Sequence, residues 1–293
     1  RSRGLGDVYK RQFMKIRTYY WNDRILNPIR RVKLKLSRKP KSPYLRIGNA
    51  GDLFTRDIIQ WKYGKEPENI KKRGQRILII GSISHQVMPG DIICGIGTRG
   101  ETTKIDYASA VSVYALRGPI SCENFRSQGY DLSNLKSIYD PGLLARFIFH
   151  DLVEEFKDPI KNNLIFIPHY KDMDRYPEVL ENGIRTINVD SEPKKLAVEI
   201  LKAEHVFSSS LHGIIFAHSL GRPASLVKNL SNEISIKYKD YYASIDQSLP
   251  KIVDNIREDC FSSLPISPVT LKLSADDFYL PEIDELILKQ ICV

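Results

Sequence analysis

The sequence predicts an α/β protein made of two Rossmann-like domains that face each other across a cleft. Short apolar runs typical of buried strands alternate with amphipathic helical patterns, which indicates parallel sheets. This alternation occurs in two blocks, separated by the segment 147–161. The length of 293 residues is also sufficient for two domains of about 140 residues each.

The first block, residues 14–148, begins with a strand-like run after Met14. A helix is expected next, because apolar residues recur every three or four positions after the small residues 48–52, and Asp52 is placed to cap it. Pro119 suits the first turn of a second helix. The strands expected in this block are Lys15–Trp21, Arg76–Ile80, Asp91–Cys94, Val111–Leu116 and Ser137–Tyr139.

The second block, residues 160–249, repeats the alternation of strands and helices. Its expected strands are Leu164–Ile167, Ile184–Val189, His205–Phe207 and Ala224–Val227. Its expected helices are Lys194–Lys202 and Leu211–Leu220. The remaining tail, residues 250–293, ends in the amphipathic stretch Pro281–Ile291, which we expect to pack back onto one of the domains.

Composition excludes several classes of protein. With 42% hydrophobic and 27% charged residues the chain is expected to be globular, and no apolar run reaches the roughly 18 residues of a membrane span. No secretory signal is visible and the four cysteines form no CxxC pair, so we expect reduced thiols and a cytoplasmic location. No metal and no cofactor are expected.

The net charge of +9 is concentrated near the N-terminus. Between Arg11 and Arg46 there are twelve Lys or Arg residues and one acid, Asp23. Such a segment either is a solvated arm or attracts an anionic surface, and peripheral contact with an anionic membrane is favoured over nucleic acid. Residues 7–12 read as a sequence that a common sequencing adaptor can encode, so we expect the natural chain to start at Met14.

Two short motifs are considered and set aside. Residues 95–100 match GxGxxG, but no apolar helix follows and the next strand ends in Arg117 rather than an acid. We therefore expect a strand-terminal loop at which another group approaches the backbone, not a dinucleotide site. Asp172-Met173-Asp174 has the spacing of a DxD metal motif, but flanking basic residues favour a solvated loop.

The segment from Ser208 to Gly213 is the most informative part of the sequence. It joins a strand to a helix, where hydroxyls and free N–H groups can bind a phosphate or carboxylate. His212 falls in the first helical turn, at the sheet edge where open α/β folds bind ligands. We therefore predict an anion site formed by Ser208, Ser209, Ser210 and Gly213, with His212 beside it.

Two basic residues end strands of the two blocks. Arg117 follows a strand of the first block, and its guanidinium suits a carboxylate or phosphate. Lys228 holds the equivalent position in the second block. We expect both to face the same cleft as His212.

Together these segments resemble the polysaccharide pyruvyl transferase family. The matching stretches are Gly48–Asp52, Gly95–Gly97, Leu116–Pro119, Asp140–Leu144, Pro168-His169, Ser208–Ala217 and Leu220–Pro223. The resemblance implies a glycosyltransferase-B-like fold. It also implies transfer of the enolpyruvyl unit of phosphoenolpyruvate to two hydroxyls of a sugar, with a pyruvate ketal and phosphate as products.

By position, Arg117 and His212 match the phosphoenolpyruvate-site residues of that family, and Lys228 matches a basic position less securely. On chemical grounds we expect His212 to be the general acid, with a pKa near neutral, and Arg117 to hold the donor. Many members have Arg where this chain has Ser210, so one anion contact is missing or supplied elsewhere. The base is unassigned, with Asp52 and His169 as candidates.

The resemblance leaves the acceptor open. A lipid-linked saccharide of a cell-surface polysaccharide is expected, because phosphoenolpyruvate is a cytosolic metabolite. Two other classes remain: a glycosyltransferase that uses a nucleotide-sugar donor, and a noncatalytic carbohydrate- or lipid-binding module.

Overall fold

The structure, a computed structural model, describes residues 14–22, 45–100, 108–231, 236–256 and 267–293. Its strands form two sheets in which every neighbouring pair is parallel. This confirms the prediction of an α/β fold with parallel sheets. Within the described ranges no helix is long and apolar enough to cross a membrane.

The first sheet has the strand order β2-β1-β3-β4-β5. Its strands are β1 (Lys15–Thr18), β2 (Glu66–Asn69), β3 (Ile77–Leu78), β4 (Ile92–Cys94) and β5 (Ser112–Ala115). Strand β2 was not predicted, because its sequence Glu-Pro-Glu-Asn is polar and its place at the sheet edge leaves it half exposed. The predicted strand Ser137–Tyr139 is reduced to a single parallel bridge between Ala115 and Ser137.

The second sheet has the strand order β7-β6-β8-β9. Its strands are β6 (Leu164–Ile167), β7 (Arg185–Thr186), β8 (His205–Ser208) and β9 (Ala224–Leu226). Strand β8 is buried at all four positions, as expected of a central strand in a parallel sheet. The strands of the first sheet all fall within residues 14–148 and those of the second within 160–249. The domain boundaries themselves stay predictions.

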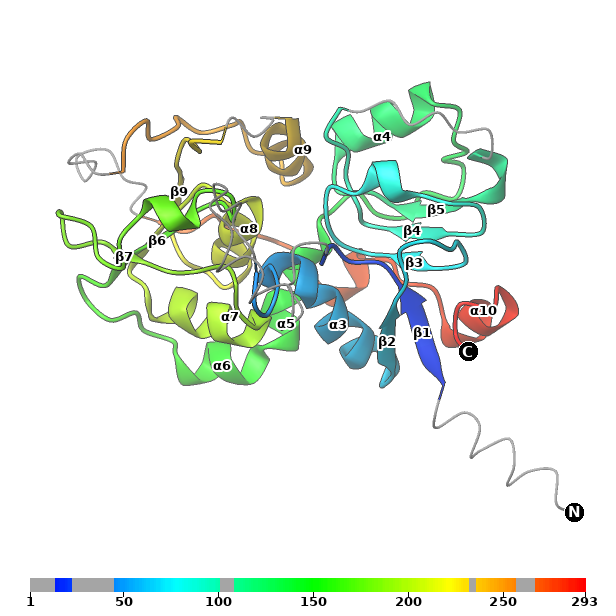
Figure 1. The fold of residues 1–293 in the computed structure, drawn as a ribbon, viewed down its shortest axis with the longest axis horizontal. Coiled ribbons are helices and arrows are strands. Elements are labelled where there is room, and N and C mark those ends of the chain that lie inside the picture. The colour runs from blue at the N-terminus through cyan, green and yellow to red at the C-terminus, as the bar shows by residue number, and fades with distance from the viewer. Residues whose placement is uncertain (1–13, 23–44, 101–107, 232–235, 257–266) are drawn as a thin grey trace, which may run out of the picture.

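Eight α-helices lie in the described residues, and those at residues 145–148, 150–155 and 236–244 were not predicted. The eight helices are α3 (Ala50–Tyr63), α4 (Pro119–Ser127), α5 (Ala145–Ile148), α6 (His150–Glu155), α7 (Pro193–Lys202), α8 (Leu211–Ser219), α9 (Ile236–Ser244) and α10 (Ile283–Leu288). Figure 1 shows the two sheets side by side, with α3 and α9 between them. Helix α3 packs against α7, and α9 packs against α4, so both helices join elements distant in sequence.

The start of α3 corrects one prediction. Its N-cap is Asn49, whose side chain accepts a hydrogen bond from the Gly51 N–H at 3.3 Å, and not Asp52. Asp52 instead lies in the first turn of the helix and is buried. The cap moves three residues upstream because the chain leaves the extended conformation at Asn49.

The C-terminal tail packs back onto the first sheet, as expected. Residues 291–293 pair with β1 in antiparallel fashion, with the Lys15 N–H donating to the Val293 carbonyl at 2.6 Å. Leu286 of α10 and Ile291 are fully buried beneath this strand pair. The tail therefore adds a further backbone pairing along β1, and apolar core, to the first sheet.

Candidate functional site

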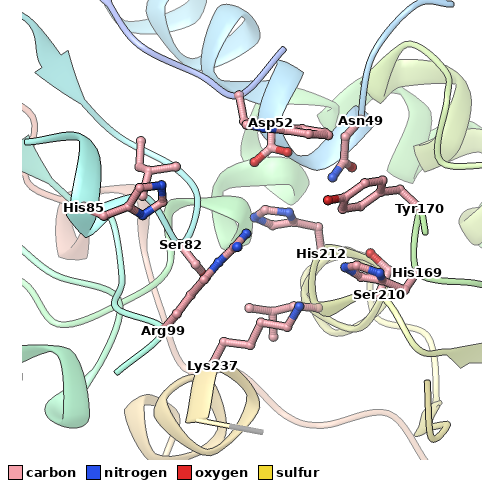
Figure 2. Close-up of a pocket in the computed structure, with 13 residues that line it drawn as sticks. Asn49, Asp52, Ser82, His85, Arg99, His169, Tyr170, Ser210, His212 and Lys237 are labelled. Carbon is pink, nitrogen blue, oxygen red and sulfur yellow. The ribbon is translucent and has the colours of Figure 1, made fainter. Parts of the chain in front are cut away.

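A pocket of about 110 Å³ lies where the carboxyl ends of both sheets meet the start of α3. Open α/β folds bind ligands at this edge of a parallel sheet, so the position alone suggests a site. Figure 2 shows polar side chains from several elements turned into the same space. The pocket is lined by Trp21, Asn49, Asp52, Ser82, Ile83, His85, Arg99, His169, Tyr170, Ser210, Leu211, His212 and Lys237.

The turn between β8 and α8 places His212 in the pocket but uses its serine hydroxyls differently from the prediction. The Ser208 hydroxyl donates to the Ile167 carbonyl at 2.9 Å and accepts from the Ser210 N–H at 3.0 Å. The Ser209 hydroxyl accepts from the His169 N–H at 2.9 Å. These two serines therefore shape the turn, and among the three only Ser210 lines the pocket.

Gly213 serves the same turn. A Cβ at this position would lie 2.3 Å from the Ser208 hydroxyl oxygen, so only glycine lets the helix approach the strand end this closely. The predicted anion cradle of Ser208, Ser209 and Gly213 thus appears in the structure as a rigid support beneath His212. Its rigidity is useful, because a fixed imidazole is already positioned for a ligand.

His212 is buried, with 8% of its surface exposed. Its Nε2 atom is buried and has no hydrogen-bond partner in the part of the chain that the structure describes. The ring lies against the backbone of α3, where a Cβ on Gly51 would come within 2.1 Å of its Nδ1 atom. A buried, unpartnered nitrogen that lines a pocket is what a ligand-binding imidazole presents before the ligand arrives.

The ionisation of His212 differs from the prediction. Burial, with the nearby charges of Arg117 and Lys237, lowers the pKa of His212 to about 3. The expected near-neutral pKa of His212 is therefore wrong, and its imidazole is neutral at pH 7. The sequence placed His212 at the sheet edge but did not show that it would be enclosed.

Asp52 has the opposite shift. Burial raises the pKa of Asp52 to about 7, although the charges of Arg99 and Lys237 and a hydrogen bond with Asn49 lower it. At neutral pH the pocket therefore contains a carboxyl group close to half protonated and a neutral imidazole. Paired groups with pKa values driven apart in this way are suited to exchange protons with a substrate.

Arg117 does not line the pocket. Its side chain is 1% exposed, and its Nε atom donates to Asp240 of α9 at 2.9 Å. Its other nitrogens donate to the Ser82 hydroxyl at 2.6 Å and to the Thr98 carbonyl at 2.8 Å. The sequence placed Arg117 correctly at a strand end, but its guanidinium is taken up by protein groups.

The cations that line the pocket are Arg99 and Lys237, and sequence reasoning missed both. Arg99 belongs to the GxGxxG loop after β4, and its buried Nε atom has no hydrogen-bond partner among the described residues. Lys237, 6% exposed, comes from the second residue of α9. No motif marks Lys237, and the Arg99 loop was examined only as a dinucleotide motif.

The loop after β4 behaves as predicted in one respect. A Cβ on Gly97 would come within 2.1 Å of the Arg117 guanidinium carbon, so glycine there permits a close approach to the backbone. The approaching group is thus a side chain of the protein.

The remaining predicted residues divide between the pocket and the surface. His169 and Asp52, the two candidate bases, both line the pocket, as a base that acts on a bound sugar must. Lys228 lies outside it, with a side chain 64% exposed and 3.6 Å from Asp254. Most of the basic segment between Arg11 and Arg46 falls outside the described residues.

The DxD segment is only partly the solvated loop that was expected. Asp172 is fully buried, and its carboxylate accepts from the Leu230 N–H at 3.1 Å and the Ser231 hydroxyl at 3.2 Å. Asp174 is exposed, so the two acids do not face one site. Among the described residues no group of His, Cys, Asp and Glu could hold a metal ion.

In a comparison with models of known protein families, residues 92–232 match the family described as polysaccharide pyruvyl transferase. This match confirms the family resemblance predicted from the sequence, and at family level it supports a transferase of polysaccharide biosynthesis. The matched stretch contains Arg99, Arg117 and the turn of Ser208 to His212.

Two individual proteins are also similar. An uncharacterized protein of Acanthamoeba polyphaga mimivirus is 28% identical over 212 residues, which cover 67% of this chain and 72% of that protein. The crystal structure of an uncharacterized protein from Klebsiella pneumoniae aligns with a TM-score of 0.43 and 14% identity. This alignment covers 87% of this chain and 100% of the other.

Proposed function

We propose that this protein is a polysaccharide pyruvyl transferase that moves the enolpyruvyl unit of phosphoenolpyruvate onto two hydroxyls of a sugar, releasing phosphate. The observation that carries the proposal is the pocket, in which two cations accompany an acid and a neutral imidazole. Of these four groups, Arg99 and His212 belong to the stretch that matches the family model. In this proposal the two sheets belong to two Rossmann-like domains, arranged as in glycosyltransferase-B folds, with the pocket between them.

The donor carries a carboxylate and a phosphate, so its site needs fixed positive charge. Arg99 and Lys237 supply that charge, and the unpartnered Nε atom of Arg99 is a donor ready for an anionic oxygen. Asn49 and Ser210 add polar groups to the lining of the pocket. In this assignment Arg99 and Lys237 take the place of the arginine that many family members have at the position of Ser210.

In the first step, the Asp52 carboxyl group protonates the methylene carbon of the donor. The first sugar hydroxyl bonds to the central carbon as the carbon–carbon double bond is lost, and its proton passes to Nε2 of His212. The pKa of Asp52, about 7, gives it a proton to donate at neutral pH, and the low pKa of His212 leaves Nε2 unprotonated there. The negative charge of the donor beside the ring would raise the pKa of His212 and so let Nε2 accept the hydroxyl proton.

In the second step, the bond from the central carbon to the phosphate oxygen breaks. The phosphate leaves with the proton held by His212, and the second sugar hydroxyl bonds to the same carbon. The proton of that hydroxyl returns to the Asp52 carboxylate. Both side chains end in their starting states: the first hydroxyl proton leaves with the phosphate, and the second replaces the Asp52 proton that went to the methyl group. The scheme needs no cofactor.

This scheme changes the roles expected from the sequence. Asp52, a candidate base there, becomes the acid of the first step, and His212 becomes its base. His169 lines the same pocket but takes no proton in the scheme.

The proposed acceptor is a lipid-linked saccharide. The basic segment between Arg11 and Arg46 would then rest on an anionic membrane that carries the acceptor. Sedimentation with vesicles of anionic lipid tests this contact, which should weaken as salt is added and be lost when the Lys and Arg residues between Arg24 and Lys41 are replaced by Gln, a change that leaves β1 intact. Equal sedimentation of the parent and the Gln variant would contradict it.

The experiment for the reaction is phosphate release from phosphoenolpyruvate with a panel of lipid-linked and aryl glycosides. We expect release that depends on one sugar, and loss of release in Asp52→Asn and His212→Gln. Lys228→Ala is the matched control, since it removes a cation that lies outside the pocket. Thermal stabilisation by nucleotides but not by phosphoenolpyruvate would instead favour a glycosyltransferase with a nucleotide-sugar donor.

A further inference from the structure

Arg117 and Asp240 form a buried ion pair that joins the end of β5 to α9. The two side chains are 1% and 0% exposed, and the Nε atom of Arg117 lies 2.9 Å from the Asp240 carboxylate. These residues are 123 positions apart in sequence. Truncating one partner of such a pair leaves the other charge buried and unpaired, so the pair strongly favours one placement of α9.

Further hydrogen bonds complete the carboxylate's coordination. Asp240 accepts from the Ser121 N–H at 2.9 Å and from the Ser121 hydroxyl at 2.6 Å. Ser121 lies in the first turn of α4, so the carboxylate also benefits from the positive end of that helix. The Ser121 hydroxyl in turn accepts from the Thr98 N–H at 3.0 Å, which ties the loop that carries Arg99 into the same network.

Packing leaves α9 little freedom to move. A Cβ on Gly118 would lie 2.2 Å from the Asp240 carbonyl oxygen, so the helix backbone touches the turn after β5. At Gly97 the backbone comes equally close to the Arg117 guanidinium, because a Cβ there would lie 2.1 Å from its central carbon. Both members of the pair are therefore packed against backbone and are poorly placed to exchange each other for a ligand.

The pair acts on the pocket at two points. Lys237 precedes Asp240 by three residues on α9, which is close to one helical turn, so fixing Asp240 fixes the stem of Lys237. Arg117 also donates to the hydroxyl of Ser82, a second pocket residue. Arg117 and Asp240 thus reach the site through Lys237 and Ser82.

We propose that the Arg117–Asp240 pair is a positioning clamp that holds Lys237 of α9 against an anionic ligand in the pocket. Arg117 is then a positioning residue, and Lys237 makes the anion contact. The ligand is a compound with a phosphate or carboxylate group. The identification of this ligand as phosphoenolpyruvate rests on the proposed function. The clamp itself requires only that some phosphate or carboxylate compound binds in the pocket.

The test is a double-mutant cycle on anion binding, measured by calorimetry on the full chain. We expect Lys237→Met to weaken the binding of phosphoenolpyruvate and of inorganic phosphate by on the order of 10- to 100-fold, the effect of losing one charge-assisted contact. Lys237→Arg should restore most of that loss. Asp240→Asn should weaken binding by about tenfold in the parent protein and by less than about twofold in the Lys237→Met protein.

Arg117→Lys separates the clamp from direct contact. The lysine keeps the positive charge but cannot donate hydrogen bonds to all three partners of Arg117. The clamp therefore predicts weaker anion binding in the parent protein, and little further weakening in the Lys237→Met protein. A further loss of about tenfold in that background would mean that residue 117 itself contacts the anion, and would overturn the proposal. Losses from Asp240→Asn and Lys237→Met that simply multiply would overturn it as well.

The first sheet offers a matched control for structural damage. Arg76 and Asp91 form another fully buried pair, 2.6 Å apart, at the opposite end of the strands from the pocket. Asp91→Asn should lower stability comparably and leave anion binding within about twofold of the parent value. Equal weakening of anion binding by Asp91→Asn and Asp240→Asn would mean that both variants act only by lowering stability, and would overturn the proposal.

The anions used also separate this inference from the proposed function. Binding of inorganic phosphate without binding of phosphoenolpyruvate would contradict the donor assignment, while the coupling of Asp240 to Lys237 would still support the clamp. Binding of neither anion by the parent protein would overturn both.

Discussion

The raised pKa of Asp52 makes a measurable prediction about stability. In the unfolded chain this carboxyl should titrate near the ordinary pKa of an aspartate, 3.8, whereas in the folded protein its pKa is about 7. Between these values the folded state binds the proton more tightly, so stability falls as pH rises through this window and the full cost is reached above pH 7. One pKa unit corresponds to about 1.4 kcal/mol.

The variant Asp52→Asn removes this titration while keeping the shape of the side chain. For the parent protein, the two pKa values give a cost of about 1.7 kcal/mol at pH 5 and about 4 kcal/mol at pH 8. The free energy of unfolding of the variant, relative to the parent, should therefore increase by roughly 2.5 kcal/mol between pH 5 and pH 8. Urea denaturation of both proteins at a series of pH values measures this difference.

An exposed carboxylate provides the control. Asp276→Asn changes the same functional group on the surface, and its difference from the parent should stay constant from pH 5 to pH 8. If the Asp52→Asn difference is equally constant, the carboxyl is not held in its protonated form by burial. The proton donor of the proposed mechanism would then be lost.

Three further predictions concern the pocket. Sulfate, which does not titrate in this range, should bind more tightly to the parent protein as the pH falls through about 7, because protonation of Asp52 removes a repelling charge. Calorimetry measures this affinity, and the Asp52→Asn protein should show no such trend. Gly51→Ala should abolish phosphate release from a folded protein, because its Cβ would lie 2.1 Å from Nδ1 of His212; normal turnover would show that the ring need not occupy this position. Lys228→Ala should leave anion affinity within about twofold, because this side chain is 64% exposed outside the pocket, and a tenfold loss would restore its predicted role.

Much of the fold follows from local patterns in the sequence. The run Leu164–Ile167 is a strand because continuous apolar residues suit a sheet covered on both faces, and Val206 and Phe207 form the apolar centre of β8. Strand β2 escaped notice because an edge strand needs few apolar residues and tolerates proline. Local rules thus predict the buried strands better than the edges.

The site was predictable only where a motif marks it. His212 and Ser210 were found because the junction of a strand and a helix has a readable pattern. Lys237 carries no such pattern, and its place in the pocket depends on where α9 packs. The partner of Arg117 lies 123 residues away, so the sequence could place the guanidinium at a strand end but could not show which group neutralises it.

The same limit applies to ionisation. The identities of Asp52 and His212 are visible in the sequence, but their pKa values depend on burial by several distant segments. For this reason the proposed scheme exchanges the acid and base roles that were expected from the sequence for His212 and Asp52.

The most direct test of the central proposal is mass spectrometry of a glycoside acceptor after incubation with phosphoenolpyruvate and the full chain. We expect the acceptor to gain the mass of one pyruvate less one water, in step with one phosphate released, and we expect Asp52→Asn and His212→Gln to abolish both. Phosphate release without any change in the acceptor, or an acceptor that gains a sugar from a nucleotide-sugar donor, would contradict pyruvyl transfer at this site.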